Sequence, residues 1–219
     1  AVLDPAAARA AGSRGCARWC RGGGAAWAVW AGGSARAEQT RVGRVQRLAD
    51  ADVRLRPGGR VMEVAAAQDA RWPLGAKADL VSDTQLACMR AGLSSSVVSG
   101  RQRQAARDYA QAHADTLDGD LRVLEAGAAR LIGDAMLAGA GDPAPRLPTS
   151  ATPEETQALA AFATEPRYAA LRRATGLDAL LGGGTERAAQ RGRDLGHALV
   201  VKAMTDAFLS CHIPVKLLY

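Results

Sequence analysis

Four cysteines and three histidines are the residues of this 219-residue chain whose chemistry is easiest to test against their spacing. Cys88 and Cys211 fall in segments with helical spacing, one in the first helix of the C-terminal two thirds and one in the last. If those ends are neighbours in a closed bundle, a disulfide could stabilise the fold by up to roughly 4–5 kcal/mol. Such a bond would indicate an oxidising compartment, whereas two buried free thiols are the alternative. Cys16 and Cys20 have i,i+4 spacing but lack the second ligand pair of a zinc site.

The histidines His113, His197 and His212 show no metal-peptidase spacing. Asp194 lies three residues before His197, so a hydrolase that uses His197 and Asp194 as an acid/base pair is one hypothesis. A histidine on the surface or at the core edge is the simpler interpretation. No G-x-S-x-G motif and no phosphate-binding Gly-Lys-Ser/Thr loop occurs. We therefore predict no catalytic residue, no cofactor and no metal.

The net charge of +6 is concentrated in the first third of the chain. Residues 1–75 contain 12 arginines and 6 acidic residues, and the remainder is neutral. This Arg-rich front, together with Arg101, Arg103 and Arg107, supports an alternative hypothesis of a cytoplasmic nucleic-acid-binding protein. Acidic residues follow these arginines closely, so a solvated helix face is the favoured interpretation and nucleic acid is an unlikely partner.

The acidic residues Asp115, Asp118 and Asp120 resemble half of a calcium loop. The loop glycine and the closing glutamate of an EF-hand are missing at the required spacing. We therefore interpret Asp118 and Asp120 as charges at the N-terminus of a helix, where the helix dipole favours them.

Residues 14–37 have the outline of a secretory signal: arginines, then a small apolar stretch, then Ala35-Arg36-Ala37. A flexible Gly/Ala tail is the alternative. No run of 18 apolar residues occurs, which excludes a transmembrane helix on the sequence criterion. The first 75 residues lack Lys, Ile, Phe and Tyr, so they offer few side chains for a core. A GC-rich gene read outside its true frame would give the same composition.

Residues 41–75 predict a short β-hairpin, since scattered valines flank a Pro-Gly-Gly turn. The domain prediction is therefore a signal-like or disordered segment over 1–37, an irregular or small hairpin segment over 38–78, and a helical domain over 79–219.

The helical domain is predicted from stripes and caps. Ser82 with Gln85, and Thr152 with Glu155, have the form of capping boxes. Two helices, near 117–139 and 185–213, carry apolar stripes at alternating steps of four and three. The stripe residues predicted to fill the core are Leu117, Leu121, Leu124, Leu131, Val201, Met204 and Phe208. The fold class expected is all-α, an orthogonal or up-down bundle of about five or six helices.

The segment Thr152-Pro153-Glu154-Glu155, followed by Leu159, Ala161-Phe162 and Pro166, resembles an uncharacterised family of small all-helical periplasmic domains of Gram-negative bacteria. It departs from that family's pattern at Thr156 and Ala163. The resemblance implies an exported helical bundle with no known activity, and it supplies no catalytic residue.

These observations favour a non-enzymatic, exported helical protein of the bacterial envelope that acts by binding another protein. The expected location is the periplasm or outside the cell, with the cytoplasm as the alternative. The identity of the partner and the oligomeric state are not encoded in any motif of the chain.

Overall fold

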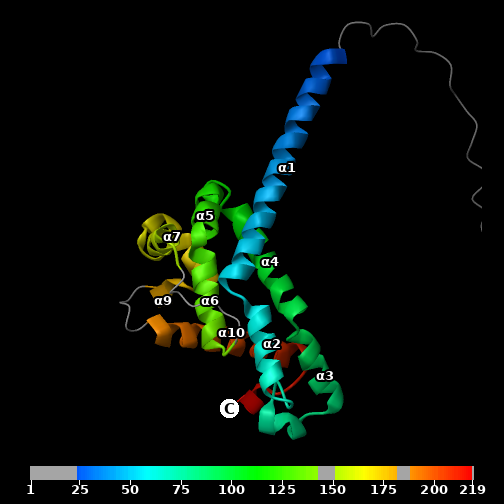
Figure 1. Ribbon diagram of the computed structural model, residues 1–219. Coiled ribbons are helices and arrows are strands. Elements are labelled where there is room, and N and C mark those ends of the chain that lie inside the picture. Colours follow the sequence, from blue (N-terminus) through cyan, green and yellow to red (C-terminus); the bar gives the residue numbers. More distant parts are fainter. Residues whose placement is uncertain (1–23, 143–150, 182–187, 219) are drawn as a thin grey trace, which may run out of the picture. The chain divides into compact units, whose positions relative to one another are not determined.

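The computed structural model describes residues 24–142, 151–181 and 188–218 (Figure 1). Every element in these ranges is helical, which confirms the all-α class. The chain forms two compact units, Ala1–Thr40 and Arg41–Tyr219. The second unit contains the hydrophobic core.

The α-helices follow one another with short 3₁₀ turns between several of them. Their bounds are α1 Gly24–Leu55, α2 Gly58–Gln68, α3 Asp83–Gly92, α4 Ser95–Ala112, α5 Leu117–Val123, α6 Ala129–Gly139, α7 Pro153–Thr164, α8 Ala169–Thr175, α9 Asp178–Leu181 and α10 Ala188–Ser210. The expected five or six helices are too few for the described residues, because turns divide the chain into shorter segments.

Two helices begin where their capping residues predict. The Ser82 hydroxyl accepts a hydrogen bond from the Gln85 amide at 3.2 Å, and the Ser82 amide donates to the Gln85 side chain at 3.1 Å. Thr152 and Glu155 make the same reciprocal pair at 3.2 and 3.0 Å, with Pro153 at the first helical position. Both capping boxes satisfy N–H groups that a helix start otherwise leaves without partners.

The larger of two hydrophobic clusters lies where α1, α4, α7 and α8 pack around α5 and α6. It combines the end of α1 with residues of α4 to α8, among them Leu48, Leu55, Tyr109, Leu117, Leu121, Leu124, Ile132, Phe162 and Leu171. The stripe residues Leu117, Leu121 and Leu124 are all at most 3% exposed, and Leu131 is 6% exposed. The stripe predicted near 117–139 therefore faces the protein interior.

The second hydrophobic cluster joins residues far apart in the sequence. It contains Met62 of α2, Met89 of α3, Leu93, and four residues at and beyond the end of α10, namely Ala207, Phe208, Cys211 and Ile213. Phe208 is fully buried in it, and Met204 packs against it partly buried. Figure 1 shows the red end of α10 beside the cyan and green helices α2 and α3.

Val201 departs from the stripe predicted for the last helix. Its side chain is 44% exposed, whereas Ala207 and Phe208 are buried. The residues of α10 that pack against the second cluster are Val200, Ala203, Met204, Ala207, Phe208 and Cys211. Each position along a helix turns by about 100°, so Val201 falls beside this face rather than on it.

The prediction of a hairpin or irregular segment over residues 38–78 is wrong. This range is helical over most of its length, and the second unit begins at Arg41 rather than at the expected boundary of residue 79. Leu48, Ala51 and Leu55 are at most 1% exposed. The Pro-Gly pair that suggested a β-turn instead connects α1 to α2, because helix-to-helix turns use the same residue types.

Close approaches of the backbone fix α6 in place. Between α5 and α6 lies a π-helical turn, Leu124–Ala128, in which Gly127 has φ 126° and faces Glu155 of α7. Gly133 of α6 packs directly against the carbonyl group of Arg54, near the end of α1. Any larger side chain at Gly133 would occupy the space of that carbonyl oxygen.

Candidate binding pocket

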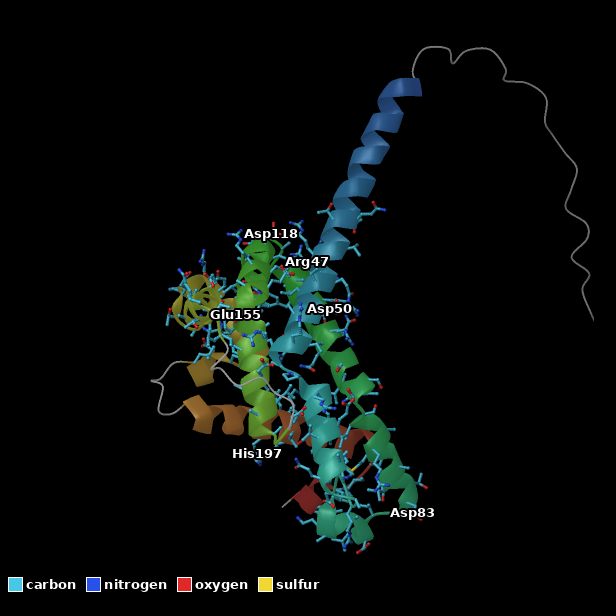
Figure 2. All side chains as sticks on the ribbon, in the orientation of Figure 1. Arg47, Asp50, Asp83, Asp118, Glu155 and His197 are labelled. Carbon is cyan, nitrogen blue, oxygen red and sulfur yellow. A yellow bond between two sulfur atoms is a disulfide. The ribbon has the colours of Figure 1, made fainter. Side chains whose placement is uncertain are left out.

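The two cysteines predicted to pair are bonded to each other. The Cys88 and Cys211 sulfur atoms are 2.02 Å apart and join α3 to the residue that follows α10, across 123 positions of sequence (yellow in Figure 2). The bond therefore closes the second hydrophobic cluster, to which Met89, Phe208 and Cys211 belong. Cys16 and Cys20 lie outside the described residues.

None of the histidines lies in a site suited to catalysis among the described residues. His197 is an exposed residue of α10 (Figure 2), and the side chain of Asp194 lies outside the described part of the chain. His113 stacks on Tyr109 with ring centroids 4.4 Å apart. His212 is exposed and occupies the left-handed region with φ 54°. The described residues contain no group of three His, Cys, Asp or Glu side chains that could hold a metal.

Asp120 lies in the first turn of α5, as predicted, and its side chain is buried. It is 1% exposed and accepts hydrogen bonds from the Tyr109 hydroxyl at 2.9 Å and the Thr116 hydroxyl at 3.1 Å. Burial raises the pKa of Asp120, and these two hydrogen bonds oppose the rise. Burial also raises the pKa of Tyr109. Tyr109 lines a space of only about 20 Å³, which is too small for a ligand, so we assign the pair a structural role in joining α4 to α5.

Asp118 lies in the first turn of α5, as predicted, and pairs with an arginine of another helix. The Arg44 guanidinium donates to both of its carboxylate oxygens, at 3.0 and 2.8 Å. Arg47 pairs in the same way with Glu125 (Arg47 and Asp118 are labelled in Figure 2). These ion pairs join α1 to α5 and to the π-helical turn that follows α5.

The three arginines proposed for nucleic-acid binding do not form a free basic surface. Arg103 lies 3.5 Å from the Asp50 carboxylate, and Arg107 donates to the Gln104 side chain at 3.4 Å. Arg101 is exposed. Asp108 is exposed on the same helix and accepts from Gln104, so negative charge is interspersed among these arginines.

Asp52 and Arg56 form a buried ion pair near a small internal space. Their closest atoms are 2.5 Å apart, with side chains 4% and 12% exposed, and Arg56 also donates to the carbonyl of Thr175 at 3.3 Å. Burial raises the pKa of Asp52 while Arg56 opposes the rise. The space beside them holds only about 20 Å³. This space is too small for a ligand. We therefore assign the ion pair a structural role, in which Arg56 joins the end of α1 to α8.

A pocket with room for a ligand lies between α2, the loop after it, and the junction of α3 with α4. Its volume is about 490 Å³, within the range of small-molecule and side-chain sites. Apolar residues on its walls are Met62, Ala66, Ala70, Trp72 and Leu93, and polar ones are Glu63, Asp69, Arg90, Ser94 and Ser95. Met62 and Leu93 are each 2% exposed and form its base.

Arg90 holds the pocket loop against α3. Its Nε donates to the carbonyl of Trp72 at 3.0 Å, and its Nη2 donates to the carbonyl of Ala70 at 3.3 Å. The loop also closes on itself, since the Asp69 carboxylate accepts from the amide of Arg71 at 2.8 Å. Trp72 thereby becomes a partly buried wall that packs against the second cluster. The disulfide at Cys88, two residues before Arg90, braces the same helix.

Glu63 stands at the rim as a charged group. A hydrogen bond from Ser95 and a second from Arg60 hold the pKa of Glu63 below its usual value. The Arg60 contact is 3.1 Å, and the Glu63 side chain is 47% exposed. Arg60 is shared, because it also donates to the buried carboxylate of Asp142 at 2.8 Å. Glu63 is therefore ionised at neutral pH and accessible to a partner.

These pocket residues carry no motif in the sequence. Glu63, Trp72 and Arg90 come from α2, a loop and α3, and only the packing of those elements brings them together. The one indication in the sequence is the Trp72-Pro73-Leu74-Gly75 segment, whose proline and glycine are typical of a break between elements. An aromatic wall with two carboxylates and a guanidinium is suited to recognition of a ligand.

Comparison with known proteins returned no relative: no family model, no curated protein and no solved structure matches this chain. The resemblance of the Thr152–Pro166 segment to helical periplasmic domains therefore stays a prediction. No described helix is both long enough and apolar enough to cross a membrane.

Proposed function

We propose that this chain is a non-enzymatic, exported protein of the bacterial envelope that works by binding another protein through the pocket between α2, the loop 69–75 and α3. In this proposal residues 41–219 act as a helical bundle braced by a disulfide, and residues 14–37 act as the export signal. The observation that carries it is the Cys88–Cys211 bond, which joins the helix beside the pocket to the end of α10.

The disulfide supports export because such bonds persist in oxidising compartments and are rare where thioredoxin and glutathione keep thiols reduced. Its position supports a role for the pocket. The bond lies two residues from Arg90, whose guanidinium holds the Trp72 wall in place. A braced, partly apolar pocket with accessible charge at its rim is typical of a recognition site.

The compartment is tested by the state of the thiols in the native host. Cells are treated with a membrane-permeant alkylating reagent before lysis, and the Cys88 and Cys211 peptides are then examined by mass spectrometry with and without reductant. The proposal expects both cysteines to be unmodified before reduction and linked to each other. Recovery of both as alkylated free thiols would overturn export.

Binding through the pocket is tested in the same cells by a photo-crosslinking residue placed at Ala66, which is an exposed residue of the pocket wall. Ala112, exposed at the end of α4, is the matched control. The proposal expects a discrete protein adduct from Ala66 and none from Ala112. Equal adducts at both positions, or none at Ala66 in folded and oxidised protein, would contradict it.

A further inference from the structure

Negative charge exceeds positive charge on the pocket lining. Glu63 and Asp69 are the carboxylates and Arg90 is the cation among the described residues that line it. The Nε and Nη2 groups of Arg90 are already directed at the carbonyl oxygens of Trp72 and Ala70. The guanidinium is therefore engaged with the loop. The lining residues carry a net charge of about −1, and Arg60, outside the lining, partly neutralises Glu63 from 3.1 Å away.

The apolar part of the lining suits a long aliphatic or aromatic stem. Met62 and Leu93 are buried at the base, Trp72 provides an aromatic wall, and the short side chains of Ala66 and Ala70 leave the space open. Burying apolar surface here favours binding. An aromatic ring also attracts a cation placed over its face.

An anion is a poor fit, even though the first turn of α4 is nearby. Helix N-termini attract negative charge, and Ser94 and Ser95 lie at this one. The ionised Glu63 already provides a negative charge at this helix start, because it accepts a hydrogen bond from Ser95. A second anion would meet the repulsion of Glu63 at the rim.

We infer that the pocket binds a basic side chain, lysine or arginine, presented by a peptide segment of the partner protein. The inference rests on the proposed function and names the chemistry of that partner at the same site. The aliphatic stem lies against Met62, Leu93 and Trp72, where long basic side chains bury their methylenes. The charged head remains at the rim with Glu63 and Asp69.

The test uses three capped tripeptides, acetyl-Leu-X-Leu-amide with X as arginine, norleucine or glutamate. They are titrated into the oxidised full chain labelled with ¹⁵N, and the indole N–H resonance of Trp72 is followed. The Trp72→Phe variant assigns that resonance among the four tryptophans. The inference expects saturable shifts with the arginine peptide, weaker ones with norleucine and none with glutamate, and a smaller affinity at higher salt.

Glu63→Gln should weaken binding of the arginine peptide by about three- to fivefold, the effect of a partly exposed ion pair. Asp108→Asn, which removes an exposed carboxylate of α4 outside the pocket, should leave the affinity unchanged. Circular dichroism melting verifies that each variant is folded. Equal affinity for the arginine and norleucine peptides, or a Trp72 resonance that none of the peptides moves, overturns the inference. Such a result alongside a discrete Ala66 adduct would leave the proposed function standing, whereas peptide binding without the adduct would remove the proposed function instead.

Discussion

Gly133→Ala tests the closest backbone approach in the fold. A Cβ built at Gly133 would overlap the carbonyl oxygen of Arg54, with the carbonyl carbon 3.2 Å away and the Pro57 Cδ 3.6 Å away. The obstacle is backbone, which cannot rotate aside as a side chain does, so α6 must separate from the turn between α1 and α2. Overpacking of this kind costs about 1–3 kcal/mol and sometimes more. It outweighs the gain of about 1 kcal/mol that alanine has over glycine in a helix.

Gly100→Ala is the matched control. Gly100 lies within α4, and a Cβ there meets nothing within 4 Å. This variant should be more stable than the parent by about 0.5–1 kcal/mol. Both variants gain the same helix propensity, so they should differ by the overpacking cost alone, about 1–3 kcal/mol in unfolding free energy. For a domain of this size that corresponds to melting temperatures about 2–12 °C apart.

The assay is urea unfolding followed by the far-ultraviolet circular dichroism of the helices. A common slope is fitted for the parent and the two variants. Gly133→Ala should move the midpoint down and Gly100→Ala should move it up. Equal midpoints for the two variants would refute the reasoning, because α6 would then have room beside Arg54.

Three further predictions concern the disulfide, two carboxyl groups and the face of α10. Reduction of the disulfide should lower the unfolding free energy by about 2–5 kcal/mol, measured as the urea midpoint with and without reductant, and an unchanged midpoint would contradict the bracing role. Burial raises the pKa of Asp120, so its stabilising contribution is present at low pH and is lost as pH rises through the folded pKa. Glu155 behaves oppositely: hydrogen bonds from Arg130 and the Thr152 amide lower its pKa from 4.5 to about 2, so its contribution is lost as pH falls through that range. Relative to the parent, Asp120→Asn should therefore gain stability as pH rises and Glu155→Gln as pH falls, and parallel pH profiles would oppose both assignments. Phe208→Ala should cost about 3–5 kcal/mol and Val201→Ala about 0.5 kcal/mol or less by thermal melting, and similar costs would place Val201 in the core after all.

Local chemistry explains which parts of the fold can be predicted from the sequence. The capping residues Ser82 and Thr152 act on the backbone of their own first turn, so their effect depends on no distant contact. The stripe from Leu117 to Leu131 is similarly set by helix periodicity. The disulfide required one further assumption, that the ends of the helical domain meet, and the packing of α10 against α3 satisfies it.

The contribution of the first third of the chain to the core is hard to predict, because alanines share it with only a few large residues such as Leu48 and Leu55. Ala49 and Ala51 are fully buried in α1, where short side chains allow neighbouring helices to come close. A composition of Ala, Gly and Arg suggests a disordered segment when it is judged by the number of large apolar residues. Here the arginines also serve the fold, since Arg44 and Arg56 pair with carboxylates.

The pocket and the orientation of α10 depend on tertiary contacts that no spacing reveals. Glu63, Trp72 and Arg90 become neighbours only when α2 packs beside α3 and α4. Val201 differs from the buried face of α10 by a single position, and the sequence offers apolar residues on both sides of that choice. The buried side of α10 is the one that packs against Met62, Met89 and Leu93.

The second hydrophobic cluster also sets an order of events during synthesis. Its early members, Met62, Met89 and Leu93, leave the ribosome long before Phe208, which lies about as far along the chain from Met89 as the 123 positions between the bonded cysteines. Until the segment with Phe208 and Cys211 has been synthesised, the nascent chain carries exposed apolar surface and an unpaired thiol at Cys88. A chaperone or an oxidoreductase that meets the chain during this interval would find both on the same helix.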